Sequence, residues 1–158
     1  KLNEVFPGSE KVGVIVQGGL YNGLQRALGM MGLADQFGAC ALPTLVLNCV
    51  YPLVPEEIVE FCRDKTAVLV LEEGQPEFIE QELATLLRRR DLNTPLHGKD
   101  LLPPAGELTV EVMAGGLLSF IERYLPQHPV LEAKAWLDGI RERRDAATQA
   151  LSSPLPAR

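Results

Sequence analysis

The chain has 158 residues, a length that suits one domain with a sizeable hydrophobic core. Its hydrophobic content of 46% is ordinary for a globular protein, and its formal net charge is -6. This charge argues against a nucleic-acid-binding surface, which requires clustered Lys and Arg.

The first third of the chain predicts one strand and one helix after a polar lead-in arm, residues 1–11. Residues 12–19 (VGVIVQGG) are apolar, rich in β-branched side chains and closed by glycines, which is typical of a buried strand. Apolar residues then recur at helical spacing over 20–31, and Gly32 is expected to end that helix.

The middle of the chain repeats this alternation. Residues 44–52 (TLVLNCVYP) predict a second strand closed by Pro52, and Pro55 is expected to open a short helix. Residues 66–72 (TAVLVLE) predict a third strand. The next helix is expected to begin at Pro76, with glutamates early and arginines late, as the helix dipole favours. Its predicted apolar stripe is Phe78, Ile79, Leu83, Leu86 and Leu87.

The remaining elements are a short strand and two helices. Residues 93–100 predict a fourth strand and turn, and Pro95 suits an edge position. A longer helix is expected over 107–124. Residues 126–158 differ in composition: a polar helix over 131–147 precedes the linker-like sequence LSSPLPAR. We interpret 126–158 as a helical connector and linker to a further domain.

Strands that are apolar on both faces and alternate with helices indicate a parallel sheet covered on each side. We therefore predict that residues 12–125 form a three-layer α/β/α sandwich with a mostly parallel sheet of four to five strands. Ligands in such sheets bind beyond the carboxyl ends of the strands. Polar side chains gather in the four loops expected there, and they are the candidates for a site or a docking edge: Gln17, Tyr21, Asn22, Asn48, Tyr51, Glu72, Glu73, Gln75, His97 and Lys99.

Each chemical reading of these residues has a structural alternative. Glu72 and Glu73 follow a buried strand and point to opposite faces if it continues, so we expect no paired acid and base. One is expected to meet a partner or a loop N–H and the other to be solvated, and N–H groups of the following helix are possible donors. The loop QGGLYNG can bind phosphate on backbone N–H groups or simply form a tight turn, and it lacks the GxGxxG pattern.

His97, with Lys99 and Asp100, is either a proton relay or a hydrogen-bonded structural residue. No GxSxG motif supports a hydrolase. Three cysteines without a CxxC pair and two histidines make a metal or iron–sulfur site improbable, so free thiols in a reducing cytoplasm are expected. No apolar run has transmembrane length, which predicts a protein without a membrane partner.

Four segments in order, VGVIVQGGLYN, LVLNCVYPLVPEEIVEFC, VLVLEEGQPEFIEQEL and PLHGKDLLPPAGELT, resemble the middle region of the alpha subunit of indolepyruvate ferredoxin oxidoreductase. The resemblance covers residues 12–125, and PLVPEEI and EEGQPEFIEQEL are its most specific parts. In that family this region is similar to the transketolase C-terminal domain, which implies the same fold here.

The resemblance implies a parent enzyme that oxidatively decarboxylates aryl 2-oxoacids such as indolepyruvate. That enzyme uses thiamine diphosphate with magnesium, passes electrons through iron–sulfur clusters to ferredoxin and forms an acyl-CoA from coenzyme A. The present chain lacks a GDG motif followed by Asn and lacks cluster-type cysteine spacing. Its end, LSSPLPAR, resembles the linker before the next thiamine-binding domain of that family, so 126–158 is expected to lead to a thiamine-binding domain that is missing here. We therefore expect an organising domain that is inactive alone, holds no cofactor and no catalytic residue, and docks to sister domains and a second subunit.

Two other function classes stay open from the sequence. One is a stand-alone nucleotide- or flavin-binding α/β module, since the loop edge has the right topology but no phosphate-binding fingerprint. The other is an interaction module without an enzymatic parent.

Overall fold

The computed structural model describes residues 2–35 and 37–152. Five strands form one sheet in the order β1-β3-β2-β4-β5. The strands are β1 (Glu4–Phe6), β2 (Val12–Gln17), β3 (Thr44–Leu47), β4 (Ala67–Leu71) and β5 (Leu96–His97). The helices are η1 (Gly18–Leu20, a 3-10 turn), α1 (Tyr21–Met30), α2 (Pro55–Cys62), α3 (Phe78–Arg89), α4 (Val110–Tyr124) and α5 (Leu131–Ser152).

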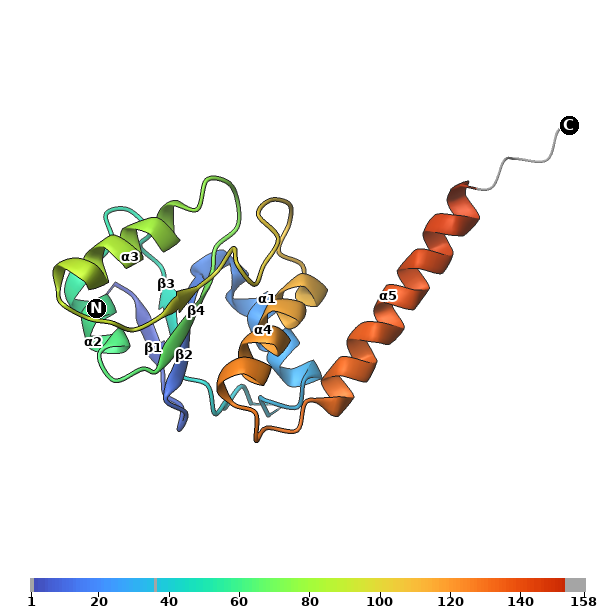
Figure 1. Ribbon diagram of the computed structural model, residues 1–158, viewed down its shortest axis with the longest axis horizontal. Coiled ribbons are helices and arrows are strands. Elements are labelled where there is room, and N and C mark those ends of the chain that lie inside the picture. Colours follow the sequence, from blue (N-terminus) through green and yellow to red (C-terminus); the bar gives the residue numbers. More distant parts are fainter. Residues whose placement is uncertain (1, 36, 153–158) are drawn as a thin grey trace, which may run out of the picture.

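The predicted three-layer α/β/α sandwich is confirmed (Figure 1). Strands β3, β2, β4 and β5 are parallel, and β1 pairs antiparallel to β3 at one edge. Helices α1 and α4 cover one face of the sheet, and α2 and α3 cover the other. The mostly parallel sheet follows from the alternation of strands and helices, because a parallel connection needs a crossover segment.

Strand β4 shows why the sequence reads as an uninterrupted apolar run. Leu69 and Leu71 pack in the core beneath α1 and α4, whereas Val68 and Val70 pack beneath α2 and α3. All five residues of β4 are buried because both faces of the sheet are covered by helices. Truncating a fully buried Leu such as Leu69 to Ala costs about 2–5 kcal/mol in comparable cores.

Several boundaries differ from the predictions. Strand β3 ends at Leu47 instead of reaching Pro52, because the next backbone N–H groups leave the ladder and that of Cys49 donates to the Asn3 side chain at 3.0 Å. Helix α3 begins at Phe78, two residues after the predicted Pro76. Helix α4 begins at Val110 instead of residue 107, after the cap residue Thr109.

The predicted lead-in arm contains a strand that the sequence did not reveal. Residues Glu4–Phe6 of β1 pair with β3 in the register Glu4 to Val46 and Phe6 to Thr44. The arm is polar and its strand has three residues, too short for any hydrophobic periodicity to stand out. Pro95 does precede an edge strand, as predicted, since β5 pairs only with β4.

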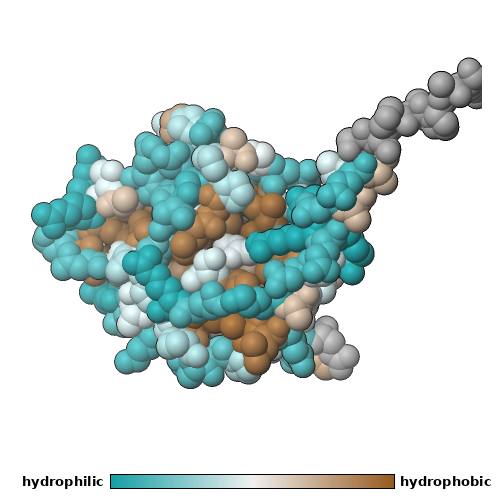
Figure 2. Space-filling model, turned by 45° about the vertical axis from the view of Figure 1, so that its right-hand side comes forward, coloured by the Kyte–Doolittle hydropathy of each residue, from teal (hydrophilic) through white to brown (hydrophobic). Residues whose placement is uncertain are grey.

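Helix α5 extends from the body of the molecule (Figure 1). It is longer than predicted and ends at Ser152, so the predicted linker begins within it and residues 153–158 lie outside the described residues. The projecting part of α5 has a mostly hydrophilic surface, whereas patches of apolar surface show on the body (Figure 2). Among residues 2–35 and 37–152, no helix has the length and apolar character needed to cross a membrane.

Candidate functional site

The carboxyl ends of β2, β3 and β4 lie together at one edge of the sheet, which we call the rim. Gln17 ends β2, Asn48 follows β3 and Glu72 follows β4. Parallel pairing of the three strands places these residues side by side although they are far apart in the sequence. The rim therefore brings together candidate residues from three of the loops in which the sequence analysis predicted a site or docking edge.

Glu72 caps helix α3 from outside the helix. Its side chain is only 5% exposed, and its two carboxylate oxygens accept hydrogen bonds from the N–H groups of Ile79 at 2.9 Å and Glu80 at 3.0 Å. The residue at the usual capping position, Glu77, makes no side-chain cap bond. Glu72 thus satisfies the two helix N–H groups that lack partners in the first turn, as the sequence analysis allowed for one of the glutamates.

Glu73 holds two loops together and is not simply solvated as expected for the second glutamate. Its backbone N–H donates to the side-chain oxygen of Gln17 at 2.8 Å. Its carboxylate accepts from the N–H of Leu108 at 2.8 Å, in the loop before α4. Although its side chain is exposed, Glu73 connects the end of β4 to the end of β2 through its N–H and to the loop before α4 through its carboxylate.

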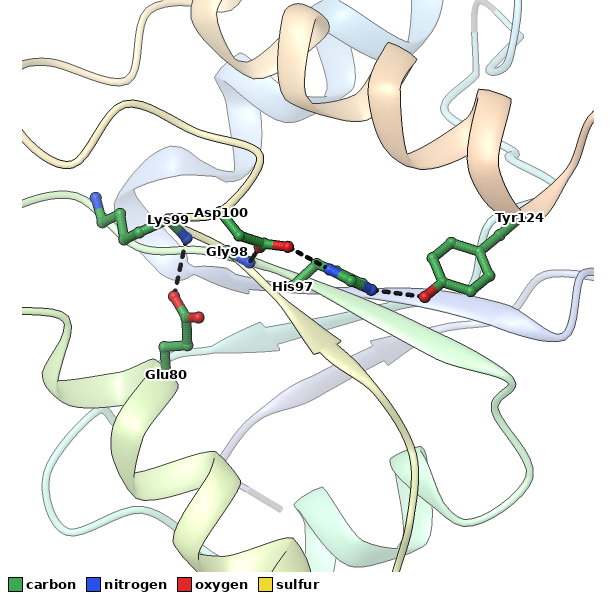
Figure 3. Close-up of polar contacts among 6 residues, drawn as sticks. All are labelled: Glu80, His97, Gly98, Lys99, Asp100 and Tyr124. Carbon is green, nitrogen blue, oxygen red and sulfur yellow. Dashed lines mark hydrogen bonds and ion pairs between the residues drawn. The ribbon is translucent and has the colours of Figure 1, made fainter.

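His97 is the buried centre of a partly exposed network with Asp100 and Tyr124 that we call the histidine latch (Figure 3). Its Nδ1 lies 2.6 Å from Asp100 Oδ2 and its Nε2 lies 2.6 Å from the Tyr124 hydroxyl. A neutral ring satisfies both contacts when Nδ1–H donates to Asp100 and Nε2 accepts from Tyr124. The Gly98 N–H also donates to Asp100 at 2.8 Å. These bonds tie β5 to α4.

The contacts of the latch favour a structural role for His97 over a role in a proton relay. The side chain is 7% exposed and both ring nitrogens have partners. Lys99, the third member of the predicted relay, turns elsewhere: its N–H donates to Glu80 at 3.0 Å and its Nζ donates to the backbone oxygen of Glu72 at 2.8 Å. Tyr124 was missed by the sequence analysis because it lies 27 residues away on another helix.

The latch also affects the ionisation of Asp100. Burial acts to raise the pKa of this carboxyl, but hydrogen bonds from His97 and from the Gly98 N–H outweigh it, so the pKa lies below its ordinary value. Asp100 is therefore an ionised acceptor over a wide pH range.

Three of the remaining candidates lie near β1 and α1. The Tyr21 ring stacks on Phe6 with centroids 4.8 Å apart, and the Asn48 amide donates to the Glu4 carboxylate at 3.1 Å. The first contact joins strand β1 to α1, and the second joins β1 to the loop after β3. Asn22 is exposed on α1 and the structure does not place it in these contacts.

Three adjoining hollows on the rim share Glu73, and together we call them the rim trough. The largest, about 860 Å³, lies over α3 and is lined by Gln17, Tyr51, Glu72, Glu73 and Gln75 among others. A hollow of about 560 Å³ reaches Asn48 at the end of β3. A third of about 620 Å³ runs between α1 and the start of α4.

Two exposed large hydrophobic residues of the largest hollow were not among the candidates. Val50 lies in the loop after β3, and Phe78 was predicted to belong to the buried stripe of its helix. Phe78 is instead 68% exposed. The buried stripe of α3 runs through Ile79, Leu83 and Leu87, and Phe78 lies about 100° around the helix from Ile79. The exposed aromatic ring therefore faces the trough.

Comparison with known proteins identifies relatives that match most of this chain. No family model matches. Indolepyruvate oxidoreductase subunit IorA of Methanothermobacter thermautotrophicus is 34% identical over 63% of the chain, and that of Thermococcus kodakarensis is 29% identical over 70%. The chain is homologous to one segment of IorA subunits. It matches only 15% and 16% of the lengths of these two relatives.

The solved structures that resemble the chain agree with the IorA relationship at the level of fold. A split-gene transketolase, an inactive beta4 tetramer, has a TM-score of 0.55 at 19% identity and covers 74% of this chain and 40% of its own. The 2-oxoglutarate:ferredoxin oxidoreductase of Magnetococcus marinus has a TM-score of 0.52 at 17% identity, over 77% of this chain and 20% of its own. The predicted transketolase C-terminal-like fold is thus confirmed.

The iron–sulfur clusters expected for a parent enzyme raise the question of whether this segment can hold a metal centre. The three cysteines are free; Cys62 is buried, and Cys40 and Cys49 are half-buried. Within residues 2–35 and 37–152, no three His, Cys, Asp or Glu side chains are grouped as metal ligands. The donor set of this segment does not fit an iron–sulfur cluster or a tightly held metal ion.

Proposed function

We propose that this chain is an organising, non-catalytic domain of a cytoplasmic, thiamine-dependent 2-oxoacid:ferredoxin oxidoreductase that acts on aryl 2-oxoacids such as indolepyruvate. The observation that carries this proposal is the use of the rim carboxylates. Both oxygens of Glu72 accept N–H groups of α3, and Glu73 accepts the N–H of Leu108. These hydrogen bonds assemble the loops of the rim, so the carboxylate oxygens are engaged in holding the domain together.

The chemistry of the parent enzyme is proposed from the relatives. IorA subunits are named for indolepyruvate oxidation, and a structural neighbour is a 2-oxoacid:ferredoxin oxidoreductase described with coenzyme A bound. Thiamine diphosphate with magnesium, iron–sulfur clusters, coenzyme A and ferredoxin would act at sister domains and at a second subunit. In the part of the chain that the structure describes, no ligand group for a cluster is assembled, and the proposal assigns no step of the reaction to this domain.

Variants of the rim carboxylates in the full-length parent test the non-catalytic role. We expect Glu72→Gln and Glu73→Gln to leave kcat for indolepyruvate-dependent ferredoxin reduction within about twofold of the unaltered enzyme, measured at a temperature where both variants are folded. Loss of a general acid or base typically costs about 10²–10⁴-fold. A loss of that size with an unchanged circular dichroism spectrum would contradict the proposal.

A second candidate function is a nucleotide- or flavin-binding module. The largest hollow of the rim trough, about 860 Å³, favours it, because it lies at the carboxyl ends of parallel strands, where such ligands bind. Titration of the folded chain with FMN, FAD and adenine nucleotides, followed by calorimetry, separates the two. Micromolar or tighter binding would support the module over the organising domain, and we expect none.

A further inference from the structure

We propose that the rim trough is the docking surface for a sister domain of the same parent polypeptide, and that the docked face is apolar with Lys and Arg around it. This inference rests on the proposed function, because it requires a parent with further domains. It goes beyond that function by naming the surface, the residues that anchor it and the chemistry of the occupant.

The first observation is the apolar content of the trough. Tyr51 is 85% exposed, Phe78 is 68% exposed and Val50 is 42% exposed, and all three line the same hollow. Tyr51 comes from the loop after β3 and Phe78 from the start of α3, so the fold gathers them from separate segments. Exposed aromatic side chains that surround a hollow are the usual anchors of protein interfaces.

The second observation is that the trough is held in place by hydrogen bonds. Glu72 fixes the start of α3, on which Phe78 lies, and Glu73 joins the ends of β4 and β2 to the loop before α4. Lys99 adds a bond from its Nζ to the backbone oxygen of Glu72. A surface that is already ordered loses little conformational entropy when a partner binds, which favours docking.

The third observation is the charge of the trough. Its charged lining consists of five glutamates and two arginines: Glu72, Glu73, Glu82, Glu107, Glu111, Arg26 and Arg89. Hydrogen bonds from the Thr109 hydroxyl and the backbone hold the pKa of Glu111 below its ordinary value, with Arg144 and Arg26 contributing. The excess of carboxylates around apolar anchors is complementary to a face that carries Lys and Arg.

The lengths of the relatives indicate what covers the trough. The matched segment makes up 15–17% of each IorA subunit, so most of each relative's length lies outside it. The hollows extend from α3 across the carboxyl ends of β4, β2 and β3 to α1 and the start of α4. A surface of that extent suits a neighbouring domain better than a compact ligand.

Hydroxyl-radical footprinting of the full-length parent tests the inference. Oxidation rates of Tyr51 and Phe78 are measured by mass spectrometry in the native and the urea-unfolded polypeptide, with the 86% exposed Phe37 as an internal control. If the trough is covered, the two anchors should oxidise at least about fivefold more slowly in the native protein, and Phe37 should change far less. Protection below about twofold at Tyr51 and Phe78 would overturn the inference.

A charge-reversal pair tests the predicted chemistry of the docked face. Glu82 lines the trough, so Glu82→Lys is the test variant. Asp64 is exposed between α2 and β4, at the opposite end of β4 from the trough, so Asp64→Lys is the matched control. We expect Glu82→Lys to increase the oxidation rate of Tyr51 by about threefold and Asp64→Lys to leave it unchanged, since like charges across an interface repel. Equal effects of the two substitutions would count against a basic partner face.

Zero-length carboxyl–amine crosslinking identifies the occupant. Crosslinks from Glu73, Glu82 or Glu107 to lysines elsewhere in the same polypeptide support the inference. Crosslinks only to the second subunit, or protection that disappears after small molecules are removed by gel filtration, overturn it.

The failure of this inference can be distinguished from failure of the proposed function. If the parent fails to oxidise 2-oxoacids but Tyr51 is protected, the proposed function fails and the docking surface stands. If it oxidises them and Tyr51 is exposed, only the docking inference fails.

Discussion

Glu72 and Glu73 are adjacent in the sequence, yet their carboxylates serve different helices. Glu72 is buried and caps α3, whereas Glu73 is exposed and contacts the loop before α4. The two side chains leave the chain on opposite sides at the end of β4, as side chains of consecutive strand residues do. This geometry is the reason that one short acidic sequence can connect two helical layers.

Removing the Glu72 carboxylate tests its role as a cap. We expect Glu72→Ala to lower the free energy of unfolding by about 1–3 kcal/mol, because the N–H groups of Ile79 and Glu80 lose their acceptors. Glu73→Ala is the matched control, and we expect it to cost about 0.5–1 kcal/mol because its carboxylate is exposed. Urea denaturation followed by circular dichroism gives both values. Equal losses for the two variants would contradict the capping role.

The histidine latch predicts a pH dependence of stability. The pKa of Asp100 is lower in the folded state than in the unfolded chain, so its contribution is fully present above the unfolded value. That contribution is lost as pH falls through the folded pKa. We expect Asp100→Asn to unfold with a shallower loss of stability below about pH 4 than the unaltered chain. Thermal melts between neutral and acidic pH measure this, and identical acid profiles would exclude the contribution.

Helices α1 and α3 end with the same hydrogen-bond pattern but with different residues. After α1, Gly32 has a φ of 69°, and the Leu33 N–H donates to the Leu28 carbonyl at 2.8 Å. After α3, Asp91 has a φ of 54°, and the Leu92 N–H donates to the Leu87 carbonyl at 3.0 Å. Both ends are Schellman motifs, which require a left-handed residue and favour glycine there.

This comparison predicts substitutions of opposite sign. We expect Gly32→Ala to destabilise the chain by about 1 kcal/mol, because a Cβ disfavours the left-handed conformation. We expect Asp91→Gly to stabilise it by about 0.5 kcal/mol, since relief of that strain exceeds the greater freedom of glycine in the unfolded chain. Urea midpoints at constant slope measure both effects. Stabilisation by Gly32→Ala would show that this helix end does not depend on its left-handed residue.

At the scale of the whole molecule, the body and the far part of α5 differ in how they are held. Ala133 and Leu137 are buried in the core that α1 and α4 share, whereas residues 141–150 are all exposed. A helix that is polar on every side gains little from packing on the body. We propose that this part of α5 serves as the predicted connector to a neighbouring domain.

Truncation separates the two parts of α5. We expect removal of residues 141–158 to change the free energy of unfolding by less than about 0.5 kcal/mol, because no buried side chain of 141–150 is lost. Leu137→Ala, in contrast, should cost about 2–4 kcal/mol because Leu137 is 2% exposed. Urea denaturation of the truncated chain and the variant checks both values. A large loss on truncation would mean that the outer helix packs on the body.

The sequence by itself determined the order and type of most elements and the edge of the sheet at which polar residues gather. Apolar strands and amphipathic helices carry that information locally, because burial of each face is encoded by the spacing of side chains. The pairing of β1 with β3, the exposed position of Phe78 and the partnership of His97 with Tyr124 were decided only by the tertiary structure. Each of them depends on contacts between segments far apart in the chain, and no local pattern specifies such contacts.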